Sequence, residues 1–204
     1  MSQDKPFRQN DKTTGAPHPK KPVRKAEKIP KKITASYLHN AGLYYLERFS
    51  ASTAHFRTVM RRKIRKSCTA HPDQDETTCH ALLETLIETF VRAGLLNDPL
   101  YAKAQITSLR RSGKSARAIQ VKMLVKGVPA PMTTETLGQL DTETHTDPQE
   151  AEFQAALRHA QKKRLGPFRT RGEPEPQKDL SRMARAGFSF DTARRVLHYT
   201  DDDF

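Results

Sequence analysis

The chain has few of the features that mark several common protein classes. Its 204 residues include only two cysteines and no tryptophan. No stretch approaches the roughly 18 to 20 consecutive apolar residues of a membrane-spanning helix. Two cysteines cannot supply the disulfide framework of a small secreted domain. No apolar segment follows the basic N-terminus, so we expect no signal peptide. These absences predict a cytoplasmic protein with no membrane partner.

The sequence also lacks the motifs of common catalytic sites. It contains no Gly-rich phosphate loop, no nucleophile elbow and no nucleophile–base–orienter set. Cys68, His71, Cys79 and His80 fall within thirteen residues. Because Cys79 lies on a predicted helix and His80 directly follows it, their side chains diverge and a zinc site is not expected. The acidic run 201–203 is interpreted as a solvated segment. We therefore expect no enzyme, no cofactor and no metal.

Basic charge is what the sequence has in excess. Lys and Arg number 36 against 23 Asp and Glu, which gives a net charge of +13. Residues 1–32 hold ten basic residues, three acidic residues and five of the thirteen prolines. Such a segment cannot bury enough apolar surface to offset its ordering entropy, so we predict a disordered basic tail. The overall excess predicts a polyanionic partner.

Beyond the tail, apolar residues recur at helical spacing and no β alternation is found. Ser52, Ser115 and Ser189 each stand where an N-cap residue is expected. The segment 73–76 has the spacing of a capping box. Further helix starts and stops are predicted from Asn97-Asp98-Pro99, Asp147-Pro148, Gly94, Gly113, Gly127 and Gly187. We therefore predict an all-α protein.

These signals recur along the chain. Gly127 and Gly187, which each end a basic helix, are 60 residues apart, and Ser67 stands 60 residues before Gly127. Asp98 and Asp147, each followed by Pro, are 49 residues apart. This period predicts three tandem three-helix repeats. Their expected ranges are 33–96, 97–146 and 147–204. Units that bury surface only within themselves and against neighbours form an elongated, curved array.

The basic residues outside the tail gather on predicted helices or at their edges. Three such groups with the same sign of charge indicate a shared binding surface. We interpret these basic residues as candidate contacts with a filament or with nucleic acid. They are Arg61, Arg62, Arg65, Lys66, Arg110, Arg111, Lys114, Arg117, Lys122, Lys126, Arg182, Arg185, Arg194 and Arg195. The middle repeat contributes six of them within seventeen positions, from residue 110 to residue 126.

Three segments carry a family resemblance. Residues 93–102 read AGLLNDPLYA, residues 113–128 read GKSARAIQVKMLVKGV, and residues 177–191 read QKDLSRMARAGFSFD. In order and spacing they resemble the second and third repeats of the RecX regulators of the RecA recombinase. Residues 52–66 match the first repeat more loosely. Asn97 stands where the family has Asp, and Ser67 where it has the Gly that ends a helix.

The resemblance implies a bacterial regulator that lies in the deep groove of the RecA–single-stranded DNA filament. There it would inhibit filament extension, and with it ATPase, strand exchange and co-protease activity, in recombination, DNA repair and the SOS response. It implies no catalytic residue and no cofactor. We expect a monomer whose partners are the RecA filament, single-stranded DNA and, in addition, double-stranded DNA.

The residues leave one alternative open, a helical repeat protein that binds DNA or RNA directly and has no recombinase partner. Each predicted second helix resembles a helix-turn-helix recognition element. Gln120 is one side chain suited to a base edge. Lys and Arg predominate on these helices, however, which favours contact with the nucleic-acid backbone over sequence readout.

Overall fold

The computed structural model describes residues 29–145 and 147–199. These residues form nine α-helices and one 3₁₀ helix, with no strand among them, so the all-α prediction is confirmed. The helices are α1 (Ala35–Leu46), α2 (Thr53–Ala70), α3 (Glu76–Arg92), α4 (Asp98–Arg111), α5 (Ala116–Val125), α6 (Ala130–Thr144), α7 (Pro148–Lys163), η1 (Gly166–Phe168), α8 (Pro176–Arg185) and α9 (Phe190–Leu197). Most of the predicted tail and the acidic run 201–203 lie outside the described residues.

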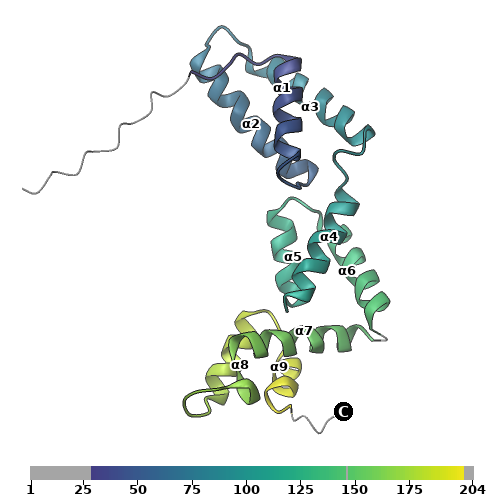
Figure 1. Ribbon diagram of the computed structural model, residues 1–204, viewed down its shortest axis with the longest axis vertical. Helices are drawn as coiled ribbons and strands as arrows, with labels where there is room; N and C mark the ends of the chain where they lie inside the picture. The colour runs from purple at the N-terminus through teal and green to yellow at the C-terminus, as the bar shows by residue number, and fades with distance from the viewer. Residues whose placement is uncertain (1–28, 146, 200–204) are drawn as a thin grey trace, which may run out of the picture.

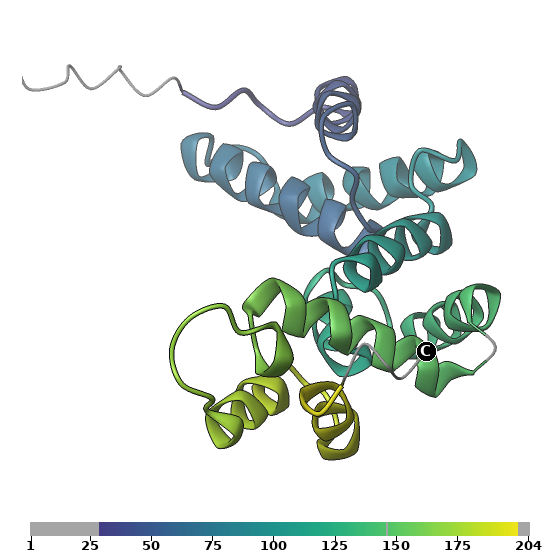
Figure 2. The same ribbon diagram turned by 60° about the horizontal axis from the view of Figure 1, so that its bottom comes forward.

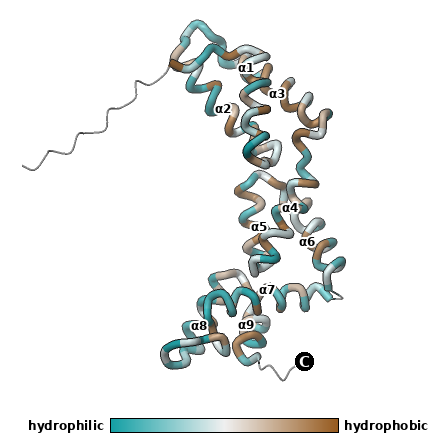
Figure 3. Tube along the Cα trace, in the orientation of Figure 1, coloured by the Kyte–Doolittle hydropathy of each residue, from teal (hydrophilic) through white to brown (hydrophobic). Residues whose placement is uncertain are grey.

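The helices pack in three successive groups, each with its own buried core. Group 1 holds α1 to α3, group 2 holds α4 to α6, and group 3 holds α7 to α9. The groups follow one another along the long axis of an elongated molecule (Figure 1). Hydrophobic residues accordingly occur in all three groups rather than in one central region (Figure 3). Small separate cores favour a modular chain, because no single core unites the molecule.

The core of group 1 explains a glycine inside a helix. Gly42 is buried in α1, where an added Cβ would lie 2.8 Å from the Phe90 ring and 3.0 Å from that of Phe56. The two phenylalanine rings pack with their centroids 5.7 Å apart. Gly42 therefore lets α1 approach this aromatic pair closely, at the cost in helix propensity that glycine brings.

A short segment before α1 is tied to group 1. The Ile33 N–H donates to Gln74 Oε1 (2.8 Å), and Gln74 Nε2 donates back to the Ile33 carbonyl (3.0 Å). Ser67 Oγ donates to the Lys31 carbonyl (2.8 Å), and Ile33 is buried. Lys31 and Lys32, which the predicted tail 1–32 includes, therefore contact group 1 through Ser67 and Asp73.

Two helix signals in the first group were assigned to the wrong residue. Asp75, not Asp73, caps α3 by accepting the N–H groups of Thr77 and Thr78, whereas Asp73 pairs with Lys32. Ser67 does not end a helix. It is buried inside α2, which continues to Ala70 and is eight residues longer than α5. The predicted equivalence of Ser67 with Gly127 is therefore wrong.

Candidate nucleic-acid interface

The start of α2 in group 1 meets the end of α5 in group 2. Ser52 Oγ accepts the His55 N–H as the N-cap of α2 and donates to the carbonyl of Lys126, the C-cap of α5. Beside it, the Thr53 N–H donates to Asp98 Oδ1 (2.7 Å). Asp98 was expected in the cap of α4. Asn97 is the cap, and Asp98 instead reaches across to group 1.

The same contact recurs between groups 2 and 3. Ser115 Oγ accepts the Ala118 N–H as the N-cap of α5 and donates to the carbonyl of Ala186 (2.7 Å), the C-cap of α8. The Ala116 N–H donates to the Glu152 carboxylate (3.1 Å). We call each of these contacts between successive groups a joint. A joint combines the serine that caps the second helix of one group with two acceptors from the following group: the carbonyl at the end of its second helix and a carboxylate of its first helix.

A glycine completes each joint. Gly127 and Gly187 follow the two carbonyls and have φ of +77° and +92°, which glycine adopts without steric cost. A Cβ on Gly127 would lie 2.6 Å from Ala54 Cβ, and one on Gly187 would lie 2.6 Å from Ser115 Oγ. Two separate reasons therefore require glycine at each of these positions. One is the positive φ of the backbone turn, and the other is the close approach of the preceding group.

The joints place the three second helices head to tail. The N-terminus of α2 meets the C-terminus of α5, and the N-terminus of α5 meets the C-terminus of α8. We call α2, α5 and α8 the second-helix column. It runs along one side of the elongated molecule (Figure 1), and Figure 2 shows the groups from a second direction. Helices that carry basic residues distant in sequence therefore follow one another along the molecule.

The α2 part of the column is strongly basic. Its buried face is Phe56, Met60 and Ile64, and the opposite face exposes the predicted residues Arg61, Arg62, Arg65 and Lys66. Arg57 and, more distantly, Arg61 pair with Glu84 of α3. The Arg57 hydrogen bond holds the pKa of Glu84 below its usual value. Arg62, Arg65 and Lys66 have no ion-pair partner among the described residues, which leaves them available to an anion.

The α5 part of the column mixes charge with exposed apolar residues. Arg117 and Lys122 are exposed, whereas Lys114 and Lys126 are half-buried, and Arg111 is exposed at the end of α4. Leu124 and Val125 are 64% and 82% exposed, and Val121 is also exposed. None of these three residues is in the predicted contact set, although their position off the Ile119–Met123 face was a usable signal. Apolar side chains do not suit phosphate, so this part of the column favours a protein surface.

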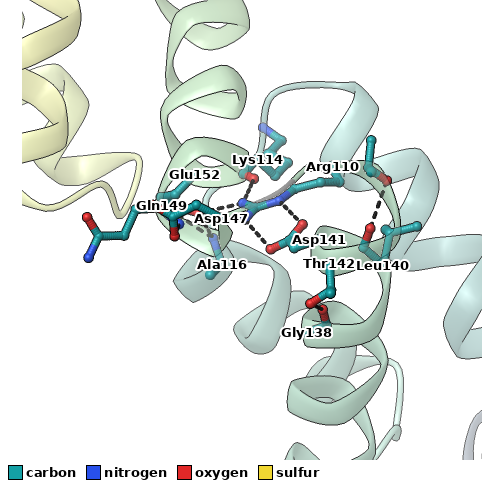
Figure 4. Close-up of polar contacts among 11 residues, drawn as sticks. Arg110, Lys114, Ala116, Gly138, Leu140, Asp141, Thr142, Asp147, Gln149 and Glu152 are labelled. Carbon is teal, nitrogen blue, oxygen red and sulfur yellow. Dashed lines mark hydrogen bonds and ion pairs between the residues drawn. The ribbon is translucent and has the colours of Figure 1, made fainter.

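Arg110 is a correction to the predicted contact set. Its side chain is only 7% exposed and lies between Asp141 of α6 and Glu152 of α7 (Figure 4). Its guanidinium donates to Asp141 (2.6 and 3.0 Å), to Glu152 and to the Lys114 carbonyl (3.2 Å). Burial lowers the pKa of Arg110, but the hydrogen bonds to both carboxylates more than offset this and raise it. Arg110 therefore links groups 2 and 3 and is not available to an external anion.

The basic residues of group 3 are divided between two helices. Arg182 and Arg185 are exposed on α8, within the column, and Arg182 pairs with Asp179 (3.0 Å). Arg194 and Arg195 are exposed on α9. Arg195 stacks over the Phe153 ring at 3.9 Å and pairs with Glu150 at 3.3 Å. The structure therefore places Arg182 and Arg185 on the second-helix column, and Arg194 and Arg195 outside it.

Two further absences hold for the described part of the chain. None of its helices is both long and apolar enough to traverse a bilayer. Within the same residues, no three His, Cys, Asp or Glu side chains gather in a way that would hold a metal ion. His71 contacts the Pro30 carbonyl, and His80 contacts Glu76.

Comparisons with known proteins give a consistent result. The chain is 38% identical over 190 residues to a "Regulatory protein RecX" from Myxococcus xanthus, covering 92% of this chain and 97% of the relative. It is 29% identical over 171 residues to a protein of the same name from Agrobacterium fabrum, covering 82% and 85%. The crystal structure of RecX from Lactobacillus salivarius is similar in fold, with a TM-score of 0.57 and 19% identity over 80% of this chain and 94% of that one. No protein-family model matches the chain.

Proposed function

This chain belongs to the RecX family of regulatory proteins, and on that premise we propose that it binds along the groove of a RecA filament on single-stranded DNA and inhibits its extension. Inhibition of ATPase, strand exchange and co-protease activity would follow, because each depends on the filament. We further propose that the three helix groups are the family's repeats, and that the protein acts as a cytoplasmic monomer.

The observation that carries the proposal is the second-helix column. Because α2, α5 and α8 join head to tail, the column extends through all three helix groups, which supports contact with more than one subunit of a helical filament. Several weak contacts on one rigid line gain affinity from effective concentration when their spacing matches the target. A compact globule with the same charge would lack this advantage.

The composition of the column matches a target made of both protein and DNA. Arg62, Arg65 and Lys66 on α2 supply positive charge for phosphate. The exposed Leu124 and Val125 on α5 supply apolar surface for a protein subunit. Basic ends with an apolar centre favour a nucleoprotein filament over naked nucleic acid.

The test is the single-stranded-DNA-dependent ATPase of RecA, with the protein titrated in at physiological salt. We expect inhibition at substoichiometric protein, because a bound regulator blocks the growth of a whole filament. The variant Arg117→Glu/Lys122→Glu, which reverses two exposed charges on α5, should lose that inhibition while keeping its helical content. Lys126 is left intact, because it is half-buried and its carbonyl belongs to a joint.

The matched control is Arg92→Glu/Lys103→Glu. Arg92 lies in the last turn of α3 and Lys103 pairs with Glu143 of α6, so both are exposed residues outside the column. The control carries the same change in net charge and should inhibit like the unmodified protein. Equal loss of inhibition in both variants would mean that net charge, not the column, governs binding, and would contradict the proposal.

Direct binding to DNA or RNA is the second candidate function, and the exposed arginines of α2 favour it. It is distinguished by binding to nucleic acid without RecA and nucleotide. A protected footprint on a defined duplex at physiological salt, with no effect on the ATPase, would move this function to first place.

A further inference from the structure

A small basic cavity lies where groups 2 and 3 meet. Its volume is about 260 Å³, and its walls come from α4, α6 and α7 rather than from the second-helix column. Three arginines, Arg110, Arg111 and Arg158, line it together with His145, the C-cap of α6. Asp141 is the acidic residue of the wall. The cavity therefore gathers basic side chains that are up to 48 residues apart in the sequence.

The acidic residue of the wall is already engaged. Both carboxylate oxygens of Asp141 accept from the Arg110 guanidinium, at 2.6 and 3.0 Å, and both side chains are buried. Glu152 takes a further N–H of Arg110 from α7 (Figure 4). Arg110 and Asp141 thus neutralise each other, and the charges of Arg111 and Arg158 remain.

Arg158 is the residue of this cavity whose position is not explained by a contact within the protein. It is half-buried, and its Nε is a buried donor without a hydrogen-bond partner among the described residues. Burial lowers the pKa of Arg158, and the charge of Arg110 lowers it further. A guanidinium that is desolvated beside another cation is unfavourable unless an anion pairs with it.

The donors that remain in the cavity are guanidinium and imidazole groups. The hydroxyls of Thr107 and Thr144 also line it, but they donate to the carbonyls of Lys103 and Leu140 in their own helices, each at 2.7 Å. Arginine side chains are well suited to the oxygens of phosphate, which they bind in pairs. The cavity is smaller than the roughly 300 to 1,000 Å³ of sites for drug-sized ligands, so its size suits one phosphate group better than a whole nucleotide.

We infer that the cavity between α4, α6 and α7 binds a phosphate group, held by the guanidinium groups of Arg111 and Arg158 with His145 as a further donor. The bound anion would supply the counterion that Arg158 lacks and would join α4 of group 2 to α7 of group 3. Two sources present this chemistry: free phosphate and the backbone of a nucleic acid. The inference does not depend on the proposed function, because the site lies outside the second-helix column.

Thermal unfolding of the full-length protein in potassium phosphate and in potassium chloride, at equal ionic strength and pH, tests the site. Phosphate is excluded from protein surfaces and stabilises folded proteins in general, so the signal is the difference between variants. We expect a saturable rise in the melting temperature, about 3 to 6 °C at tenfold the dissociation constant. Arg158→Gln and the exposed Arg111→Gln should each lose it. Lys163→Gln, an exposed residue of α7 outside the cavity, should keep it.

An equal rise in the unmodified protein and in both arginine variants would mean that exclusion alone acts, and would overturn the inference. The absence of a saturable rise in the unmodified protein would overturn it as well. Circular dichroism establishes that each variant is folded, and Arg111→Gln carries the test if Arg158→Gln is not.

Fluorescence anisotropy of a labelled single-stranded oligonucleotide then distinguishes the two sources. If the site holds backbone phosphate, Arg158→Gln should weaken binding severalfold relative to Lys163→Gln, and inorganic phosphate should compete with the oligonucleotide. Equal affinities of these two variants, together with the saturable response to phosphate, would assign the site to free phosphate.

Discussion

At the residue scale, a buried ion pair distinguishes Arg110 from its neighbour Arg111. Arg110 and Arg111 are adjacent, and both were predicted as contacts with a filament or nucleic acid. Arg110 is enclosed by Asp141 and Glu152, whereas Arg111 is exposed at the end of α4. Their difference depends on carboxylates 31 and 42 residues further along the chain. No local pattern contains that information.

The first prediction uses this adjacent pair. Arg110→Ala should lower the free energy of unfolding by about 3 to 5 kcal/mol, because it leaves two carboxylates in a partly buried site without their cation. Arg111→Ala should leave stability nearly unchanged and weaken binding to anions instead. Urea unfolding followed by circular dichroism measures the first effect. Equal stabilities of the two variants would show that the buried contacts of Arg110 contribute nothing.

The second prediction concerns Asp179, which is 1% exposed. Burial raises its pKa, but the Gly166 N–H and Arg169 outweigh burial and lower it overall. The stabilisation is therefore fully present above the unfolded pKa, near 3.9, and is lost as pH falls through the lower folded pKa. Asp179→Asn should be less stable than the unmodified protein at neutral pH, and this difference should shrink in acid. Thermal unfolding across that pH range measures it, and a constant difference would contradict the assignment.

At the element scale, the helix ends were the most predictable features and the joints the least. Ser52, Ser115 and Ser189 were predicted as caps, and all three are caps. A cap needs only its own helix, so a local signal suffices. The second hydrogen bond of Ser52 and Ser115 goes to a residue more than 70 positions away. The sequence therefore predicts the helix starts but not their contact with the next group.

The third prediction compares these serines. Ser115→Ala and Ser189→Ala each remove an N-cap and should each destabilise the protein by about 1 kcal/mol. Only Ser115 also bonds the next group, whereas the Ser189 hydroxyl bonds Thr192 in its own helix. Ser115→Ala alone should broaden the distance distribution between spin labels placed on groups 2 and 3. Similar broadening in both variants would mean that the serine hydroxyl does not fix the joint.

The fourth prediction separates backbone strain from steric clash at glycines. Gly187→Ala suffers both, because its φ is +92° and a Cβ would meet Ser115 Oγ. Gly94→Ala suffers backbone strain alone, since its φ is +71° and an added Cβ would meet no neighbouring atom within 4 Å. Gly138→Ala, within α6 and in open space, should instead gain up to about 1 kcal/mol from helix propensity. Chemical denaturation should rank Gly138→Ala above Gly94→Ala, and Gly187→Ala last; any other order would contradict the role of the joint.

At the scale of the whole molecule, sequence periodicity predicted an all-helical modular chain, and the family resemblance is confirmed by the relatives. The column itself was not predictable from the sequence. Helical period shows which face of a helix is buried, but the alignment of α2, α5 and α8 depends on the joints. Helical period also indicates that Leu124 and Val125 lie off the buried face of α5, but their place in the column depends on the joints.

The fifth prediction belongs to this scale. If the column contacts phosphates at several points, each basic contact contributes to the salt dependence of binding. Removing one such contact by substitution should reduce the steepness of log affinity against log salt by about 0.7 on single-stranded DNA. Arg62→Gln and Lys66→Gln, both on the exposed face of α2, should each lower the slope by that amount, and the double variant by twice as much. Arg92→Gln, outside the column, should leave it unaltered. Affinity titrations over a salt series measure the slopes, and an equal reduction in all three single variants would contradict a localised interface.

The two ends of each joint are chemically different, and this gives the array a direction. One group offers hydroxyl and amide donors, and the next offers a carbonyl and a carboxylate as acceptors. Such a heterologous interface does not close on itself and leads to open growth, unlike a two-fold contact. A tandem duplication of group 2, which has acceptors toward group 1 and donors toward group 3, would thus insert between its neighbours with donors already facing acceptors. The length of this protein could change in evolution by whole units without inventing a new interface.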